Sequence, residues 1–264
     1  MNSDMLVAER DDEYIVIEDV SWEAYEQILD ALGECHMRHT YDRGRLELRS
    51  VLYGVPWESY EGFLAALPEH YLRHTYDRGT LEMMSPSYNH ENKKKLVGRM
   101  LEAMCLDLDL EIVGAGSTTY ARAVGERGLQ PDESYYVVRA KRMFGRRKFD
   151  PARDPPPDLV LEVEETRHCL ARMPVFAALR VPEIWRLVKG QIEFHLLGKT
   201  GRYRKSDRSR AFPFLRPDDL NRFLADADIE NQNTLIRGFV AWARQRYEAA
   251  QKKSHPRPKR RPKE

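Results

Sequence analysis

The sequence predicts a mixed α/β protein in which a β-sheet is flanked by helices. Segments with helical and with strand-like periodicity alternate along the 264 residues, and such alternation is typical of helices packed on a sheet. Hydrophobic residues make up 42% of the chain and charged residues 32%, as in ordinary globular proteins. No apolar run approaches the roughly 18 to 20 residues that cross a bilayer, and residues 1–10 are too polar for a signal peptide. We therefore expect a cytoplasmic protein that makes no contact with a membrane.

A duplicated segment opens the chain. Residues 21–50 and 56–85 align at a spacing of 35 residues. Each copy predicts a short amphipathic helix followed by two strands, joined at a Tyr-Asp-Arg-Gly sequence whose glycine suits a tight hairpin. The identical pairs include Trp22/Trp57, Tyr25/Tyr60, His39/His74, Asp42/Asp77, Gly44/Gly79 and Glu47/Glu82. Two copies are too few for a repeat protein, so we interpret them as a tandem duplication of an opening element.

The remainder of the chain predicts the elements of the main sheet. Helices are expected over residues 90–105, 217–224 and 233–249, with another that ends near residue 180. Strands are expected over residues 110–114, 117–122, 133–140, 158–164, 182–188 and 191–197. Residues 141–157 are charged and contain proline, which predicts an excursion on the surface.

We therefore divide the chain into a duplicated helix-hairpin module (residues 1–54), a main domain (55–250) and a basic tail (251–264). Residues 252–264 hold seven basic residues and one acid, which leaves 36 basic and 41 acidic residues elsewhere. Three prolines there oppose a helix and predict a disordered arm, which either contacts nucleic-acid phosphates or only improves solubility. The first copy is too small to fold alone, so we expect it to form a homodimer or an intramolecular cap.

Three acidic residues are candidates for chemistry: Glu91 at a helix start, Asp132 after a proline, and Glu162 within an apolar strand. In that strand, Glu162 and Glu164 share one face. A carboxylate in such a place is costly to bury unless it is paired or binds a cation, and an aspartate from a neighbouring strand would complete a site for Mg²⁺ or Mn²⁺. The alternative is an edge strand whose polar face is wet, and spacing alone does not separate the two.

Several short motifs carry a resemblance to a known family. They read LEMMSPSYNHE at 81–91, AGSTT at 115–119, GLQPDESYY at 128–136, PPDLVLEV at 156–163, FAAL at 176–179 and VPEIW at 181–185. In this order, over residues 20–249, the chain resembles the Uma-type family of restriction-endonuclease-like proteins, which belongs to the PD-(D/E)xK nuclease superfamily. The resemblance implies a restriction-endonuclease-like fold, DNA as the partner and no small organic cofactor.

The resemblance also implies roles for the three acids. Asp132 matches the superfamily's Pro-Asp aspartate, Glu162 its second acidic ligand and Glu91 its helix glutamate. We expect Asp132 and Glu162 to bind Mg²⁺ or Mn²⁺ for the hydrolysis of phosphodiester bonds. His90, beside Glu91, is expected either to support this site or to lie at the helix cap.

The sequence departs from the superfamily at its lysine. That position falls at Glu164, and the lysine that many Uma-type proteins carry on the next helix aligns with Arg172. Arginine can stabilise a phosphate but does not release a proton near neutral pH. Two functions therefore stay open: a metal-dependent DNA endonuclease with Asp132, Glu162, Arg172 and Glu91 as catalytic residues, and a catalytically weakened module that binds nucleic acid or protein.

Overall fold

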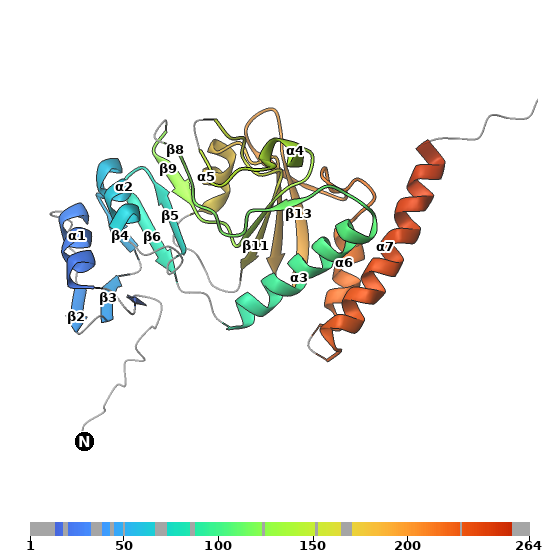
Figure 1. Cartoon of the computed structure of the whole chain (residues 1–264), viewed down its shortest axis with the longest axis horizontal. Helices are drawn as coiled ribbons and strands as arrows, with labels where there is room; N and C mark the ends of the chain where they lie inside the picture. The colour runs from blue at the N-terminus through green and yellow to red at the C-terminus, as the bar shows by residue number, and fades with distance from the viewer. Residues whose placement is uncertain are drawn as a thin grey trace, which may run out of the picture. The chain divides into compact units, whose positions relative to one another are not determined.

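The computed structural model divides into two compact units, each built from segments that are distant in sequence (Figure 1). Unit 1 comprises residues 1–87, 119–130 and 168–179, and unit 2 comprises residues 88–118, 131–167 and 180–264. The structure describes residues 14–17, 21–32, 39–42, 45–49, 51–66, 73–84, 88–122, 125–150, 153–164, 171–227 and 229–254.

Unit 1 confirms the duplication and extends it by one strand. The first copy consists of β1 (Tyr14–Ile17), α1 (Trp22–Leu32), β2 (His39–Asp42) and β3 (Arg45–Arg49). The second copy consists of β4 (Val51–Tyr53), α2 (Trp57–Ala66), β5 (Arg73–Asp77) and β6 (Thr80–Met84). Each copy is therefore a strand, a helix and a hairpin.

The two copies share their strand register residue for residue. Val16 pairs with Glu47 in the first copy, and Val51 pairs with Glu82 in the second. The hairpins repeat in the same way, because Tyr41 lies opposite Leu46 as Tyr76 lies opposite Leu81. Every partner is displaced by 35 residues, so the spacing seen in the sequence is also the spacing of the backbone pairing.

The aromatic residues that the two copies share form the same cluster twice. The rings of Tyr25 and Tyr41 stack at 4.4 Å and 15°, and those of Tyr60 and Tyr76 at 4.5 Å and 10°. Trp22 and Trp57 each lie edge-on to these stacks, at 5.6 Å from Tyr41 and Tyr76 respectively. The rings are therefore packing residues that join each helix to its hairpin.

The first copy docks on the second within unit 1. Ile28 of α1 is fully buried in the same hydrophobic cluster as Tyr60 and Phe63 of α2. The helices approach so closely that a Cβ on Gly62 would lie 3.0 Å from Cβ of Ala31. This packing within the chain agrees with the expected intramolecular cap.

The two copies differ in what their hairpins pair with. The first copy forms a sheet of order β1-β3-β2, whereas β5 of the second copy continues to β9 (Arg127–Leu129) and β8 (Tyr120–Arg122), giving the order β4-β6-β5-β9-β8. At this junction Gly128 is required, because a Cβ there would lie 2.4 Å from the Tyr60 hydroxyl. Helix α5 (Arg172–Ala178) completes unit 1.

Unit 2 contains the main sheet, in the order β14-β13-β12-β11-β10-β7. Only the pair β11–β12 is parallel; the other described pairs are antiparallel. The strands are β7 (Val113–Gly114), β10 (Glu133–Tyr136), β11 (Leu159–Glu164), β12 (Glu183–Val188), β13 (Gln191–Leu197) and β14 (Tyr203–Ser206). The helices are α3 (Tyr88–Asp107), α4 (Ala140–Met143), α6 (Pro217–Leu224) and α7 (Gln232–Ser254).

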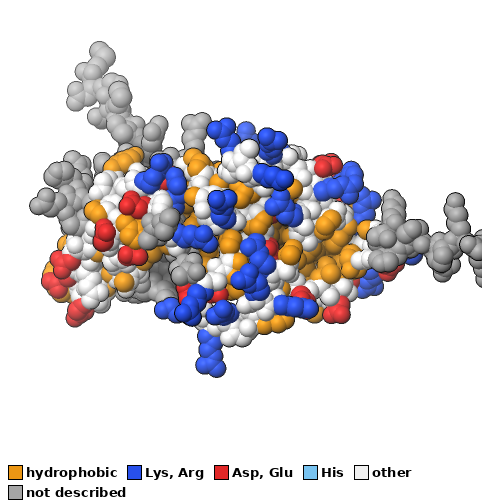
Figure 2. Space-filling view, turned by 90° about the horizontal axis from the view of Figure 1, so that it is seen from above, with side chains coloured by type: hydrophobic (Ala, Val, Ile, Leu, Met, Phe, Trp, Pro, Cys, Tyr) orange, Lys and Arg blue, Asp and Glu red, His pale blue; other side chains and the backbone are white. Residues whose placement is uncertain are grey.

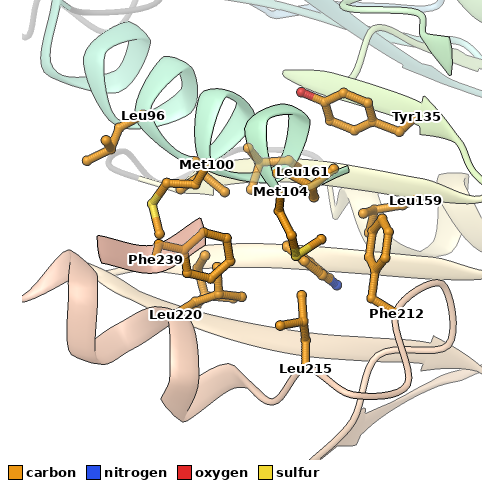
Figure 3. Close-up of a cluster of buried hydrophobic side chains, with 14 of the residues drawn as sticks. Leu96, Met100, Met104, Tyr135, Leu159, Leu161, Phe212, Leu215, Leu220 and Phe239 are labelled. Carbon is orange, nitrogen blue, oxygen red and sulfur yellow. The ribbon is translucent and has the colours of Figure 1, made fainter. Parts of the chain in front are cut away.

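One face of this sheet forms the core of unit 2 under α3, α6 and α7 (Figure 3). Leu159 and Leu161 of β11 lie in this core, as do Met100 and Met104 of α3 and Phe239 of α7. Because side chains alternate along a strand, the same register directs Val160, Glu162 and Glu164 to the opposite face. The hydrophobic face of β11 thus fixes where its carboxylates go.

Most elements predicted after residue 87 are confirmed, with corrections at their ends. The strand expected over 133–140 ends at Tyr136, because Ala140 starts the short helix α4. Strands expected over 110–114 and 117–122 are shorter, at β7 and β8, and the helix expected to end near residue 180 is described only as α5. β14 was not predicted, since Tyr203–Ser206 is too polar to mark a strand by its pattern.

The expected boundary near residue 54 falls after β4, a strand that pairs with β6 of the second copy. The first-copy module and the basic tail stay predictions as separate domains, and residues 255–264 lie outside the described part of the chain. Within the described residues, every helix is too short or too polar to span a bilayer.

Candidate active site

Asp132 and Glu162 stand opposite each other on neighbouring strands of unit 2. β10 and β11 pair with Glu133 opposite Leu161 and Ser134 opposite Val160. Continuing that register by one residue places Asp132 opposite Glu162, and cross-strand neighbours of this kind share a face of the sheet. Asp132 is 2% exposed and Glu162 is 4% exposed. Two acidic residues are therefore buried side by side on the face away from the core.

Direct contacts tie these two residues together. The backbone N–H of Asp132 donates to Oε1 of Glu162 at 3.2 Å. In return, the backbone N–H of Val163 donates to Oδ2 of Asp132 at 2.7 Å. Each carboxylate thus reaches across to the backbone of the other strand, which holds the two side chains at one place.

The first two turns of α3 bring three more polar residues to this place. Nε2 of His90 lies 2.9 Å from Oδ2 of Asp132, and Nδ1 of His90 lies 3.6 Å from Oε1 of Glu91. Glu91 in turn forms an ion pair with Nζ of Lys94. His90 and Lys94 are buried, whereas 37% of the Glu91 side chain is exposed. His90 therefore lies between Glu91 and Asp132 and contacts both carboxylates.

Glu164, two residues after Glu162 on β11, is hydrogen-bonded to an arginine. Nε and Nη2 of Arg186 donate to the two carboxylate oxygens of Glu164, at 2.7 and 2.5 Å. This bidentate hydrogen bonding raises the pKa of the Arg186 guanidinium. Arg186 is also the register partner of Glu162 in the parallel pair β11–β12. A positive charge thus lies beside the two buried acids even though residue 164 is itself acidic.

Arg172 belongs to unit 1, where it starts α5. Its Nη2 donates to the carbonyl oxygen of Gln130 at 2.5 Å, and its guanidinium lies 5.7 Å from the centre of the Phe176 ring. Gln130 directly precedes Pro131 and Asp132 in the chain. The catalytic role expected of Arg172 stays a prediction.

The residues present fit a divalent cation of the magnesium type. Mg²⁺ is commonly held by one or two carboxylates while it keeps several waters, and Asp132 with Glu162 supplies two such oxygen ligands at one buried place. Among the described residues, no group of three or more His, Cys, Asp and Glu side chains is arranged to hold a metal ion. The donors therefore suit a hard, partly hydrated cation rather than a structural zinc ion.

Lys94 is the site residue that the sequence analysis missed. It lies in a run of three lysines at positions 93–95, which is typical of a solvated helix face. The helical spacing could have identified it, because residues four apart share a face and His90 is four residues before Lys94. Of the three lysines, Lys94 alone is buried, while Lys93 is half-buried and Lys95 is exposed.

Comparison with known protein families finds one match. A family model described as "Putative restriction endonuclease", Uma2, matches residues 58–225. This match covers more than half of the chain. The chain belongs to the Uma2 family. The matched part contains Glu91, Asp132, Glu162 and Arg172, whereas the first copy of the duplication and α7 lie outside it.

A solved structure adds a more distant likeness. The Uma2 chain described here is similar to a protein from Anabaena variabilis ATCC 29413, described as a "putative nuclease belonging to DUF820". The two are 14% identical with a TM-score of 0.45, and the similarity covers 62% of this chain and 97% of the other. A search of curated proteins finds no match.

Proposed function

We propose that this Uma2 protein is a divalent-metal-dependent DNA endonuclease with a restriction-endonuclease-like core, which hydrolyses phosphodiester bonds. The observation that carries the proposal is the buried pair of Asp132 and Glu162, which face one another across β10 and β11. Burying two carboxylates side by side is unfavourable unless cationic partners compensate them. Family membership supports the reaction class.

In this proposal, Asp132 and Glu162 hold Mg²⁺ or Mn²⁺. The chemistry supplied by such a cation is polarisation of the scissile phosphate and activation of a bound water. His90 orients the Asp132 carboxylate, as its 2.9 Å contact with Oδ2 supports, and Glu91 with Lys94 fixes His90 from the solvent side. Arg172 contributes positive charge for the phosphate but accepts no proton.

Cleavage of supercoiled plasmid tests the proposal. Wild-type protein is expected to nick or linearise plasmid in Mg²⁺ or Mn²⁺ and to be inactive in EDTA. Asp132→Asn and Glu162→Gln should each lower the rate at least 100-fold, since each removes a charged ligand of the cation. Glu193→Gln is the matched control, because Glu193 is a partly buried carboxylate on β13 that pairs with Lys205 and His195 instead. Equal activity in all four proteins would refute the assignment of the site.

A second function, binding without efficient cleavage, is favoured by one specific observation. Glu164 occupies the lysine position and is held there by Arg186 in a bidentate ion pair, which leaves Arg172 as the cation for the phosphate. If the protein is a nuclease, Arg172→Ala should lose most activity, and Arg172→Lys should keep or raise it. A protein that binds DNA in EDTA but leaves plasmid intact in both metals would instead be a binding module.

A further inference from the structure

Unit 2 also contains a groove whose lining residues are distant in sequence from Asp132 and Glu162. It has a volume of about 610 Å³ and is formed by the C-terminal half of α7 and by the segment that leads into α6. Arg208, Arg216 and Arg246 line it together with Phe214 and Tyr247. The other described lining residues are proline, alanine and glutamine, so its charged lining groups are all cationic. Figure 2 shows basic side chains around an apolar patch close to where α7 ends.

The arginines favour an anionic ligand. Nε of Arg216 is buried and has no hydrogen-bond partner among the residues that the structure describes. A buried donor normally has a partner, and a bound anion would provide one. Arg208 and Arg246 are exposed, and guanidinium groups in such places bind phosphate oxygens in pairs.

The aromatic rings of the groove favour a ligand that carries a flat ring as well as an anionic group. Phe214 and Tyr247 pack edge to face, with ring centroids 5.2 Å apart, and both are half-buried. The edge-on packing supports the Tyr247 ring from one side and fixes its orientation. A flat ring flanked by arginines is the arrangement on which nucleic-acid bases stack while their phosphates are neutralised.

We propose that this groove binds a single strand of nucleic acid, with phosphates on Arg208 and Arg246 and a base against Tyr247. The volume is of the size that accommodates a small ligand, and a few unpaired nucleotides would fit it. Arg246 and Tyr247 lie on α7, beyond the part that matches the Uma2 family, whereas Arg208, Phe214 and Arg216 lie within it. Lys252 and Lys253 lie at the end of α7, and residues 252–264 together hold seven basic residues and one acid.

Fluorescence anisotropy with a labelled oligonucleotide of about 16 nucleotides tests the proposal, performed in EDTA on the full chain so that no cleavage is needed. The double variant Arg208→Ala/Arg246→Ala should weaken binding at least 10-fold. It should also make the negative slope of log K against log salt shallower by about 1.4, because each phosphate contact on a single strand contributes about −0.7. Tyr247→Leu should weaken binding by about 5-fold or more with an unchanged slope, since stacking is not ionic.

Arg237→Ala is the matched control, because Arg237 is an exposed arginine of α7 outside the groove. It should bind like wild type. Wild-type affinity in the double variant would overturn the proposal, as would equal loss in Arg237→Ala, which would indicate general charge rather than a site. A mononucleotide that competes as well as the strand would assign the groove to a small ligand and also overturn it. Loss of cleavage in Asp132→Asn with strand binding intact would show that the two sites are independent.

Discussion

At the residue scale, the buried acids of unit 2 have different tasks. Glu183 is fully buried on the core side of β12, where it accepts hydrogen bonds from Nε1 of Trp185 and from the backbone N–H groups of Arg210 and Ala211. Asp158 likewise accepts from the backbone N–H groups of Val137 and Arg139. Each of these two carboxylates holds a neighbouring segment in place through hydrogen bonds from its backbone N–H groups. Asp132 and Glu162 differ from them because each faces another acid.

Glu183→Gln should destabilise the protein by about 1–3 kcal/mol, since the amide group would turn an N–H toward backbone donors. Burial raises the pKa of the Glu183 carboxyl, with its hydrogen bonds acting in the opposite direction. The stabilisation contributed by a carboxyl with a raised pKa is present below its unfolded value and is lost as pH rises through the folded value. The free energy of unfolding in urea should therefore differ less between wild type and variant as the pH rises above the pKa of an ordinary glutamate. A difference that grows with pH would contradict this account.

At this scale, Asp132 and Glu162 became candidates through local signals, and the family resemblance then favoured them over a wet edge strand. A Pro-Asp motif and an acid in an apolar strand can be recognised without knowing the fold. Lys94 could not be recognised in this way, because a run of lysines is usually solvated. The burial of Lys94 depends on how α3 packs within unit 2. The engagement of Glu164 by Arg186 depends on the parallel pairing of β11 with β12, which residue spacing does not specify.

At the scale of elements, the duplication was predictable because identical residues recur every 35 positions. The extra strand of each copy was missed because Tyr14–Ile17 and Val51–Tyr53 share few identities, although they pair in the same register. What the second copy pairs with was also not predictable. β9 and β8 come from residues 120–129, and only the folded chain brings them beside β5.

Truncation tests how far the first copy belongs to the core. Removing residues 1–50 deletes α1 and its fully buried Ile28, which should cost about 1.5–3 kcal/mol for that side chain, but it keeps β4 paired with β6. Removing residues 1–54 also deletes β4 and should destabilise unit 1 further. Thermal unfolding followed by circular dichroism would measure both, and cation affinity should be unchanged in each. If the protein that lacks only residues 1–50 is completely unfolded, the first copy is part of the core.

At the scale of the whole molecule, the residues discussed above are distributed over two units. Unit 2 holds the acids, His90 and the arginine groove, whereas unit 1 holds Arg172 and both copies of the duplication. The sequence predicted one main domain after residue 54, because it cannot reveal that residues 119–130 and 168–179 join the N-terminal segment. The mixed α/β class was predictable from the alternation of helices and strands. The division into units was not, because it depends on contacts between distant segments.

Calorimetric titration of Mn²⁺ into the purified protein tests the central claim most directly, since it measures the cation site without requiring a substrate. We expect one site per chain in wild type and in Glu193→Gln, and a loss of affinity of at least 10-fold in both Asp132→Asn and Glu162→Gln. Far-UV circular dichroism of each variant would establish that it is folded. Unchanged Mn²⁺ affinity in the two folded acid variants would contradict the account, because Asp132 and Glu162 would then hold no shared cation.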